Sequence, residues 1–235
     1  GKTNMTMRVP RLLRGPLAGL FLALVAVLVP SFSTAHDIPT TVLIQAFVRP
    51  EGNVLRFLVR APLGSMRDII FPTRGPGFLR VAEADPFLDD AAMLWMADYV
   101  QMFENGVQLA TPRLVATRIS LPSDRSFSSY ETALANVLSP RLPDETELVW
   151  QQALVDVLFE YDIQSADSRY SIHSGLAHLG LTTTTVLRFV LPGSNEHFYQ
   201  FTGDIGLVDL DPTRVQATVQ FVETGFLYIL DGIDH

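Results

Sequence analysis

The sequence predicts a mainly β protein: an antiparallel β-sandwich formed by residues 36–210, with one or two inserted helices. Short runs rich in Val, Leu, Ile and Phe recur between Gly, Pro and Asn turn signals, a pattern typical of antiparallel strands. Helical signals interrupt this pattern in two stretches, around 86–98 and 129–138. A sheet fold with helices inserted between its strands is therefore expected.

The first strands are expected in residues 40–63, where two apolar runs flank a hairpin turn at 50–53. The second run carries Arg56 and Arg60 among its apolar residues, so one face of this strand is predicted to contact water. Residues 68–81 are punctuated by Gly and Pro, which predicts an irregular segment or an edge strand.

A helix is predicted from Pro86 to Asp98, because apolar residues recur there at steps of three and four. Asp85 would cap its N-terminus and Pro86 would occupy the first helical position. Residues 99–109 then return to strand, and Asn105-Gly106 suits a type I′ turn between two strands.

The rest of the domain is predicted to be mostly strand. A strand is expected at 113–122, a short helix from Ser129 to Leu138, and one long strand or a bent pair of strands at 146–163. Further strands are expected at 168–175, 181–193, 196–203 and 206–211.

Residues 1–35 have the layout of a secretory signal peptide. Residues 15–35 are uncharged and mostly apolar, and Ser33 and Ala35 occupy the small-residue positions before a cleavage site. Residues 1–4 precede the first methionine and are interpreted as an upstream extension. The apolar run follows the basic residues Lys2, Arg8, Arg11 and Arg14, as in the positively charged start of a signal peptide. An N-terminal helix that is not cleaved and anchors the protein in the membrane is the alternative.

The charge of the chain argues against nucleic acid as a partner. The formal net charge is −8, and cleavage after residue 35 would leave 13 arginines against 25 acidic residues, a net charge of −12. Nucleic-acid binding needs a basic surface that neutralises phosphates. The chain has no cysteine, so any metal site must use His, Asp, Glu or Tyr.

Residues 211–235 predict a helix that leaves the domain and enters a membrane. Asp211 and Pro212 are helix-start signals, and the segment becomes steadily more apolar toward its end. A complete domain usually ends in a polar tail. This sequence instead ends in a mostly apolar run, residues 225–233, followed directly by Asp234 and His235. The sequence is therefore expected to be a fragment of a longer membrane protein.

Polar side chains recur on one face of this predicted helix: Tyr228, Asp231 and His235. Carboxylate and imidazole together suit a borderline divalent cation such as Ni²⁺, Co²⁺ or Zn²⁺. Ionisable residues are costly in an apolar helix, which favours a functional role for them. A polar helix end on a soluble domain is the alternative interpretation.

The closing segment GFLYILDGIDH, residues 225–235, resembles the start of the membrane domain of the HupE/UreJ family of nickel and cobalt permeases. The family pattern is a His, five residues, then Asp-His, and Asp234 and His235 match its second half. Tyr228 stands where the family has its first His. A phenol, with an ordinary pKa of about 10, is a poorer metal ligand than imidazole near neutral pH.

Upstream segments are similar to the exported region that some HupE/UreJ-like proteins carry. The resemblance implies a bacterial inner-membrane protein with residues 36–210 on the periplasmic side and a lipid bilayer around its C-terminal continuation. It also implies transport of nickel or cobalt, with Asp234 and His235 near the path of the ion. The segments that carry this resemblance are AHDIP (35–39), VRAPL (59–63), FPTRGPG (71–77), RISLPSDRSF (118–127), LVDVLFEY (154–161) and LRF (187–189).

A soluble exported binding module is the alternative function. After cleavage, the α-amino group and imidazole of His36 could together chelate Cu²⁺, which favours nitrogen donors. Such a site needs a further histidine, from His173, His178 or His197. The spacing of His173 and His178 fits neither a helical nor a strand metal pair, and a solvated loop is expected there.

The sequence predicts no enzymatic activity. It lacks the nucleophile elbow, the zinc-protease motif, the phosphate-binding loop and the dinucleotide fingerprint. An extracytoplasmic enzyme with scattered catalytic residues is a third interpretation, which a deep pocket with convergent polar groups would favour.

Overall fold

The computed structural model describes residues 41–191, 193 and 196–210. The predicted signal peptide and the predicted membrane-entering helix lie outside these residues. Within them the fold is mainly β, which confirms the predicted fold class.

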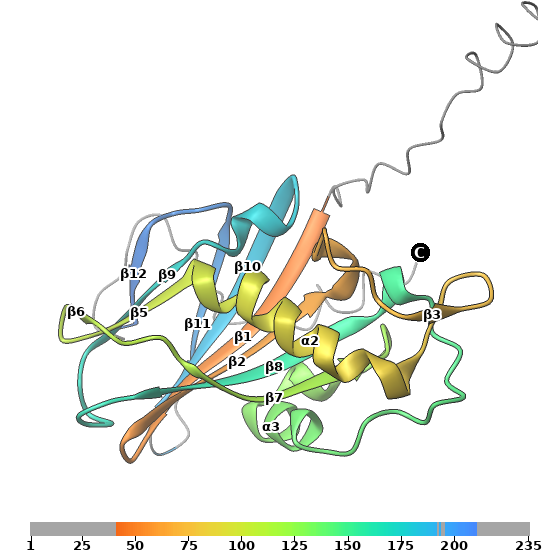
Figure 1. Ribbon diagram of the computed structural model, residues 1–235. Helices are drawn as coiled ribbons and strands as arrows, with labels where there is room; N and C mark the ends of the chain where they lie inside the picture. The colour runs from red at the N-terminus through yellow and green to blue at the C-terminus, as the bar shows by residue number, and fades with distance from the viewer. Residues whose placement is uncertain (1–40, 192, 194–195, 211–235) are drawn as a thin grey trace, which may run out of the picture. The chain divides into compact units, whose positions relative to one another are not determined.

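A six-stranded sheet forms one layer of the domain, in the order β11-β10-β1-β2-β8-β7 (Figure 1). Its neighbours are antiparallel except β1 and β10, which run parallel, so the expectation of a wholly antiparallel sandwich was wrong for this pair. A parallel pair needs a long connection, and most of the domain lies between these two strands. The strands are Thr41–Glu51 (β1), Val54–Pro62 (β2), Arg113–Ser120 (β7), Leu154–Asp162 (β8), Thr182–Val190 (β10) and Glu196–Thr202 (β11).

A four-stranded antiparallel sheet forms the opposing layer, in the order β12-β9-β5-β6. The predicted turn between β5 and β6 is confirmed, because Asn105 and Gly106 both have positive φ, 52° and 82°. The strands are Val100–Glu104 (β5), Val107–Gln108 (β6), Tyr170–Ser174 (β9) and Leu207–Asp209 (β12); Thr73–Arg74 (β3) and Phe78–Leu79 (β4) form a separate small pair.

The main core lies between the two sheets. Alternate side chains of the large sheet point into it, including Phe57 and Phe159, whose rings stack 6.2 Å apart. Met102 and Ile172 enter the same core from the small sheet. Apolar burial of this extent is the main term that stabilises the domain.

Helix α2 (Val81–Trp95) covers part of this core and crosses in front of the large sheet in Figure 1. The predicted start at Pro86, with Asp85 as cap, was wrong: the helix begins at Val81 and Pro86 lies inside it. Val81 and Ala84 are buried in line with Leu88, so the apolar face begins more than a turn before the proline. The helix also ends earlier than predicted, and Ala97–Tyr99 form a separate 3₁₀ turn, η2.

Helix α3 (Tyr130–Val137) covers the opposite face of the large sheet. The predicted short helix from Ser129 to Leu138 is confirmed to within one residue at each end, and Ser129 caps it by accepting a hydrogen bond from the Thr132 amide at 3.2 Å. With the 3₁₀ turn η3 (Ser126–Ser128), it buries a second core that includes Phe47 and Leu158. The sequence predicted that the face of β2 that carries Arg56 and Arg60 contacts water. This was wrong at Arg60, which is only 3% exposed.

Two other segments differ from their predictions. Only Leu154–Asp162 of the expected long strand at 146–163 is strand, and Trp150–Gln152 form a 3₁₀ turn, η4, before it. The segment 173–178 is not a solvated loop: it runs from the end of β9 into a 3₁₀ helix, η5 (Leu176–Leu179), whose leucines enter the core.

Candidate functional site

The predicted metal ligands Tyr228, Asp234 and His235, and the predicted copper ligand His36, lie outside the described residues. The nickel or cobalt site and the copper site therefore stay predictions.

The three internal histidines lie in different settings. His173 on β9 is near Asp204, with Nε2 3.1 Å from the carboxylate, and Nδ1 is 3.3 Å from Gln101 Oε1. His178 lies in η5, and His197 lies on β11 opposite Phe189. Across residues 41–191, 193 and 196–210, no three His, Asp or Glu side chains gather as a metal site would require.

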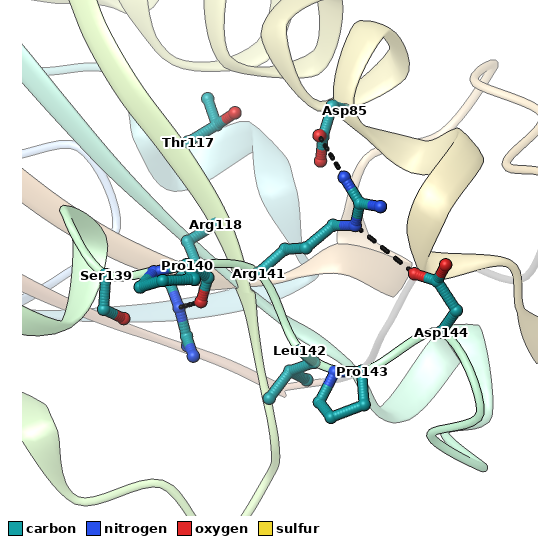
Figure 2. A pocket seen from close by; sticks show the side chains of 9 residues that line it. All are labelled: Asp85, Thr117, Arg118, Ser139, Pro140, Arg141, Leu142, Pro143 and Asp144. Carbon is teal, nitrogen blue, oxygen red and sulfur yellow. Dashed lines mark hydrogen bonds and ion pairs between the residues drawn. The ribbon is translucent and has the colours of Figure 1, made fainter.

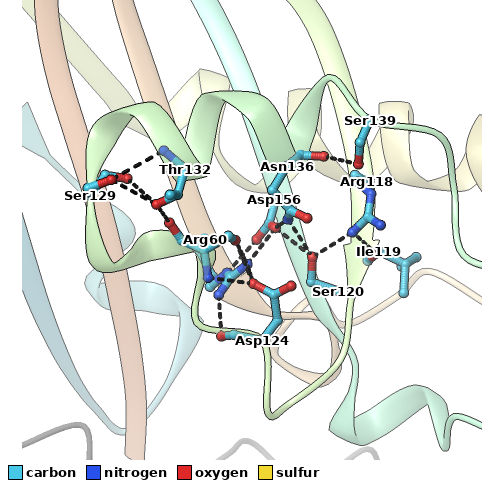
Figure 3. Close-up of polar contacts among 11 residues, drawn as sticks. Arg60, Arg118, Ile119, Ser120, Asp124, Ser129, Thr132, Asn136, Ser139 and Asp156 are labelled. Atoms are coloured by element: carbon cyan, nitrogen blue, oxygen red, sulfur yellow. Dashed lines mark hydrogen bonds and ion pairs between the residues drawn. The ribbon is translucent and has the colours of Figure 1, made fainter.

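A buried ion pair joins two neighbouring strands of the large sheet (Figure 3). Arg60 on β2 donates to Asp156 on β8 through two parallel hydrogen bonds, Nε to Oδ1 at 2.6 Å and a terminal guanidinium nitrogen to Oδ2 at 2.7 Å. The two residues are directly opposite in the strand register. Asp156 is 0% exposed, so this pair is fully removed from water. Such bidentate geometry is the strong form of the interaction.

Neighbouring polar groups complete this network. Asp156 Oδ2 also accepts hydrogen bonds from Ser120 and Asn136, at 2.6 and 2.8 Å. The same guanidinium of Arg60 reaches Asp124, whose carboxylate also accepts from the Ser126 amide. Burial opposes ionisation of Asp124, but the hydrogen bonds from Ser126 and Arg60 outweigh it and hold the pKa of Asp124 below its ordinary value.

Arginine side chains on this face also lie over aromatic rings. The guanidinium carbon of Arg60 is 4.3 Å from the centre of the Phe127 ring, and that of Arg188 is 5.0 Å from the ring of Phe47. Cation–π contacts of this kind stabilise a desolvated cation. The face beneath α3 is therefore organised around arginine, although the sequence led us to expect an exposed surface.

The network gathers segments that are far apart in the sequence. Arg60 lies in 59–63, Asp124 in 118–127 and Asp156 in 154–161, while Arg188, in 187–189, lies over Phe47 on the same face of the sheet. Sequence reasoning missed the pairing. A lone aspartate in the apolar run 154–161 was the available signal, because a buried carboxylate needs a cationic or hydrogen-bonding partner.

A polar cleft of about 600 Å³ lies beside this network, between α2, β7 and the segment 139–144 (Figure 2). Arg141 projects across it toward two carboxylates, 3.3 Å from Asp144 and 4.0 Å from Asp85. The cleft is lined by Asp85, Thr117, Arg118, Ser139, Pro140, Arg141, Leu142, Pro143 and Asp144.

Arg118 connects the cleft to the buried network. Its Nε donates to the Pro140 carbonyl at 3.2 Å, and a terminal nitrogen donates to Ser120 Oγ at the same distance. Ser120 in turn donates to Asp156. The position of the segment 139–144 thus depends on a chain of hydrogen bonds that ends at the buried carboxylate.

Most polar groups that line the cleft are engaged with other polar groups of the chain. Both carboxylates face Arg141, the Thr117 hydroxyl donates to Asp89, and the Ser139 hydroxyl donates to the Asn136 carbonyl. The arrangement offers guanidinium and carboxylate groups to a polar ligand or to another chain.

Comparison with known proteins does not assign the chain: no family model matches it, and no curated protein is significantly similar. In the part of the chain that the structure describes, none of the helices has the length and apolar character needed to span a bilayer.

Proposed function

We propose that residues 36–210 form the exported domain of a HupE/UreJ-like bacterial inner-membrane protein. In this proposal the chain after residue 210 enters the bilayer, the intact protein transports Ni²⁺ or Co²⁺, and Asp234 and His235 lie near the path of the ion. The exported domain acts as a non-catalytic binding and scaffold module.

One observation supports the proposal most. Four of the segments that carry the family resemblance contribute to the face beneath α3, where Arg60, Asp124 and Asp156 form one network and Arg188 lies over Phe47. Similarity at such positions is expected when two chains share a fold, because a buried charge without its partner is strongly destabilising. The resemblance therefore falls on residues that hold the domain together.

Uptake of radioactive nickel and cobalt by bacteria that express the intact protein tests the transport role. We expect Asp234→Asn to abolish uptake while the protein stays in the membrane fraction, because a neutral amide is a weaker ligand for a divalent cation. Thr111→Ser, a change at an exposed position of the domain, is the control and should leave uptake unchanged. Uptake that is equal in Asp234→Asn and in the unaltered protein would overturn the transport role.

A topology reporter tests the location separately. Alkaline phosphatase fused after Leu210 should be active, because residues 36–210 would lie outside the cytoplasm, and deletion of residues 1–35 should abolish that activity. Activity that persists without residues 1–35 would contradict export by a signal peptide.

A further inference from the structure

The His178 imidazole lies in an aromatic stack where three short segments meet. Its ring stacks on Tyr99 with a centroid distance of 3.7 Å and an interplanar angle of 22°. It also stacks on Trp95, at 5.5 Å and 12°. Trp95 ends α2, Tyr99 ends η2, and His178 belongs to η5, so the stack joins the end of α2 to a segment more than seventy residues away in the chain.

The hydrogen bonds around His178 suit the neutral ring. Nδ1 lies 2.8 Å from the Gly175 carbonyl, so it carries the proton and donates it there. Nε2 is buried and has no hydrogen-bond partner among the described residues. A second proton on Nε2 would therefore create a buried cationic donor without an acceptor, which is costly.

The charges near the ring also oppose protonation. Arg67, which follows the 3₁₀ turn η1 (Leu63–Ser65), donates to the His178 carbonyl at 3.1 Å, and its guanidinium carbon lies 5.7 Å from the Trp95 ring. Burial and the charge of Arg67 outweigh the bond to Gly175 and lower the pKa of His178. Among the described residues, the charged or titratable side chains that pack around His178 are Arg67 and Tyr99, and neither is a carboxylate.

The backbone fixes how closely these segments approach one another. The Gly175 amide donates to the Tyr99 carbonyl at 2.8 Å. A Cβ at position 175 would lie 2.9 Å from that carbonyl oxygen, so glycine is required at this distance. The stack thus lies beside a direct backbone contact between the end of η2 and the residue that precedes η5.

We propose that His178 is a pH-sensitive latch, which holds η2 and the end of α2 against η5 when its ring is neutral and releases them when the ring is protonated. Release uncovers the faces of the Trp95 and Tyr99 rings that His178 covers; the rest of Tyr99 is already in contact with water, since this residue is 42% exposed. Histidine is the side chain suited to such a switch between about pH 5 and 8. This inference concerns the described domain alone and does not rest on the proposed function.

Tryptophan fluorescence of the full chain tests the latch. The chain has two tryptophans, so Trp150→Phe leaves Trp95 as the only one. In that background we expect a reversible change in fluorescence with a midpoint below the ordinary histidine value of 6.5, while far-UV circular dichroism shows the sheets intact. Adding His178→Phe keeps a stacking ring but removes the titration, and should abolish the change. His173→Phe, at the histidine paired with Asp204, is the matched control and should retain it.

A fluorescence transition that survives His178→Phe would overturn the proposal. If that variant does not fold, the ring proton of His178 can be followed by NMR in the unaltered chain. A titration midpoint at or above 6.5 would then refute the latch. Arg67→Met gives an independent measurement: loss of the neighbouring cation should raise the midpoint toward 6.5, and an unchanged or lower midpoint would contradict the role given to Arg67.

Discussion

Asp156 is fully buried, and its charge is compatible with the core because Arg60 is bonded to both carboxylate oxygens. We expect Asp156→Asn to lower the free energy of unfolding by about 3–5 kcal/mol, because Arg60 would lose its buried counter-charge. Urea denaturation of the full chain measures this loss.

An exposed ion pair in the same sheet supplies the control for that measurement. Arg113 on β7 bonds to Glu160, and its side chain is 61% exposed. Arg113→Gln should therefore cost less than about 1 kcal/mol. Equal losses for the two variants would show that burial does not set the strength of the Arg60–Asp156 pair.

Asp124 gives the same network a dependence on pH. Its pKa in the folded chain lies below the ordinary value of 3.8. Its stabilising contribution is therefore fully present above pH 3.8 and is lost as the pH falls through the folded pKa. In urea titrations at successive pH values, Asp124→Asn should lose less stability than the unaltered chain in this acid range. Parallel curves would contradict the assignment.

The site was much less predictable than the strands that carry it. Arg60 and Asp156 are 96 residues apart in the sequence, and nothing local indicates that β2 and β8 are neighbours. Once they are neighbours, the register places the two side chains opposite each other on one face. The arginine then becomes a buried residue, because α3 and η3 cover that face.

The elements that sequence reasoning predicted correctly are those whose signals are local. The turn at Asn105-Gly106 needs two positive φ angles, and the start of α3 needs a side-chain cap from Ser129. The start of α2 was wrong because burial against the sheet overrides the preference of proline for a first turn. The parallel pairing of β1 with β10 depends on long-range packing, which no window of sequence contains.

The observed start of α2 at Val81, and not at Pro86, can be tested by substitution of the proline. Pro86 lies in the second turn of the helix, where its missing N–H leaves the Ala82 carbonyl without its usual intrahelical donor. We expect Pro86→Ala to raise the free energy of unfolding by about 1–3 kcal/mol, because it supplies this donor and a better helix former. Urea denaturation measures the change. If Pro86 were the first residue of the helix, the same substitution would be neutral or destabilising.

The domain as a whole is acidic, and this has a consequence for the proposed transport. Residues 36–210 carry 12 arginines and 21 acidic residues, a net charge of −9, and such a surface raises the local concentration of cations by electrostatic attraction. The effect reaches about 10 Å at 0.1 M ionic strength and only about 3 Å at 1 M. If the domain delivers Ni²⁺ or Co²⁺ to the membrane part, its contribution to uptake must decline as salt is added.

Three exposed carboxylates allow this steering to be tested: Asp90, Asp98 and Glu147. In the intact protein, the triple variant Asp90→Asn, Asp98→Asn, Glu147→Gln should slow the uptake of nickel and cobalt in a buffer of low ionic strength, because it removes three negative charges without changing side-chain size. At high ionic strength the same variant should match the unaltered protein. The variant Asp90→Glu, Asp98→Glu, Glu147→Asp keeps every charge and should behave normally in both buffers. A defect of equal size at low and high salt would mean that these side chains act through specific contacts, and not through the field of the domain.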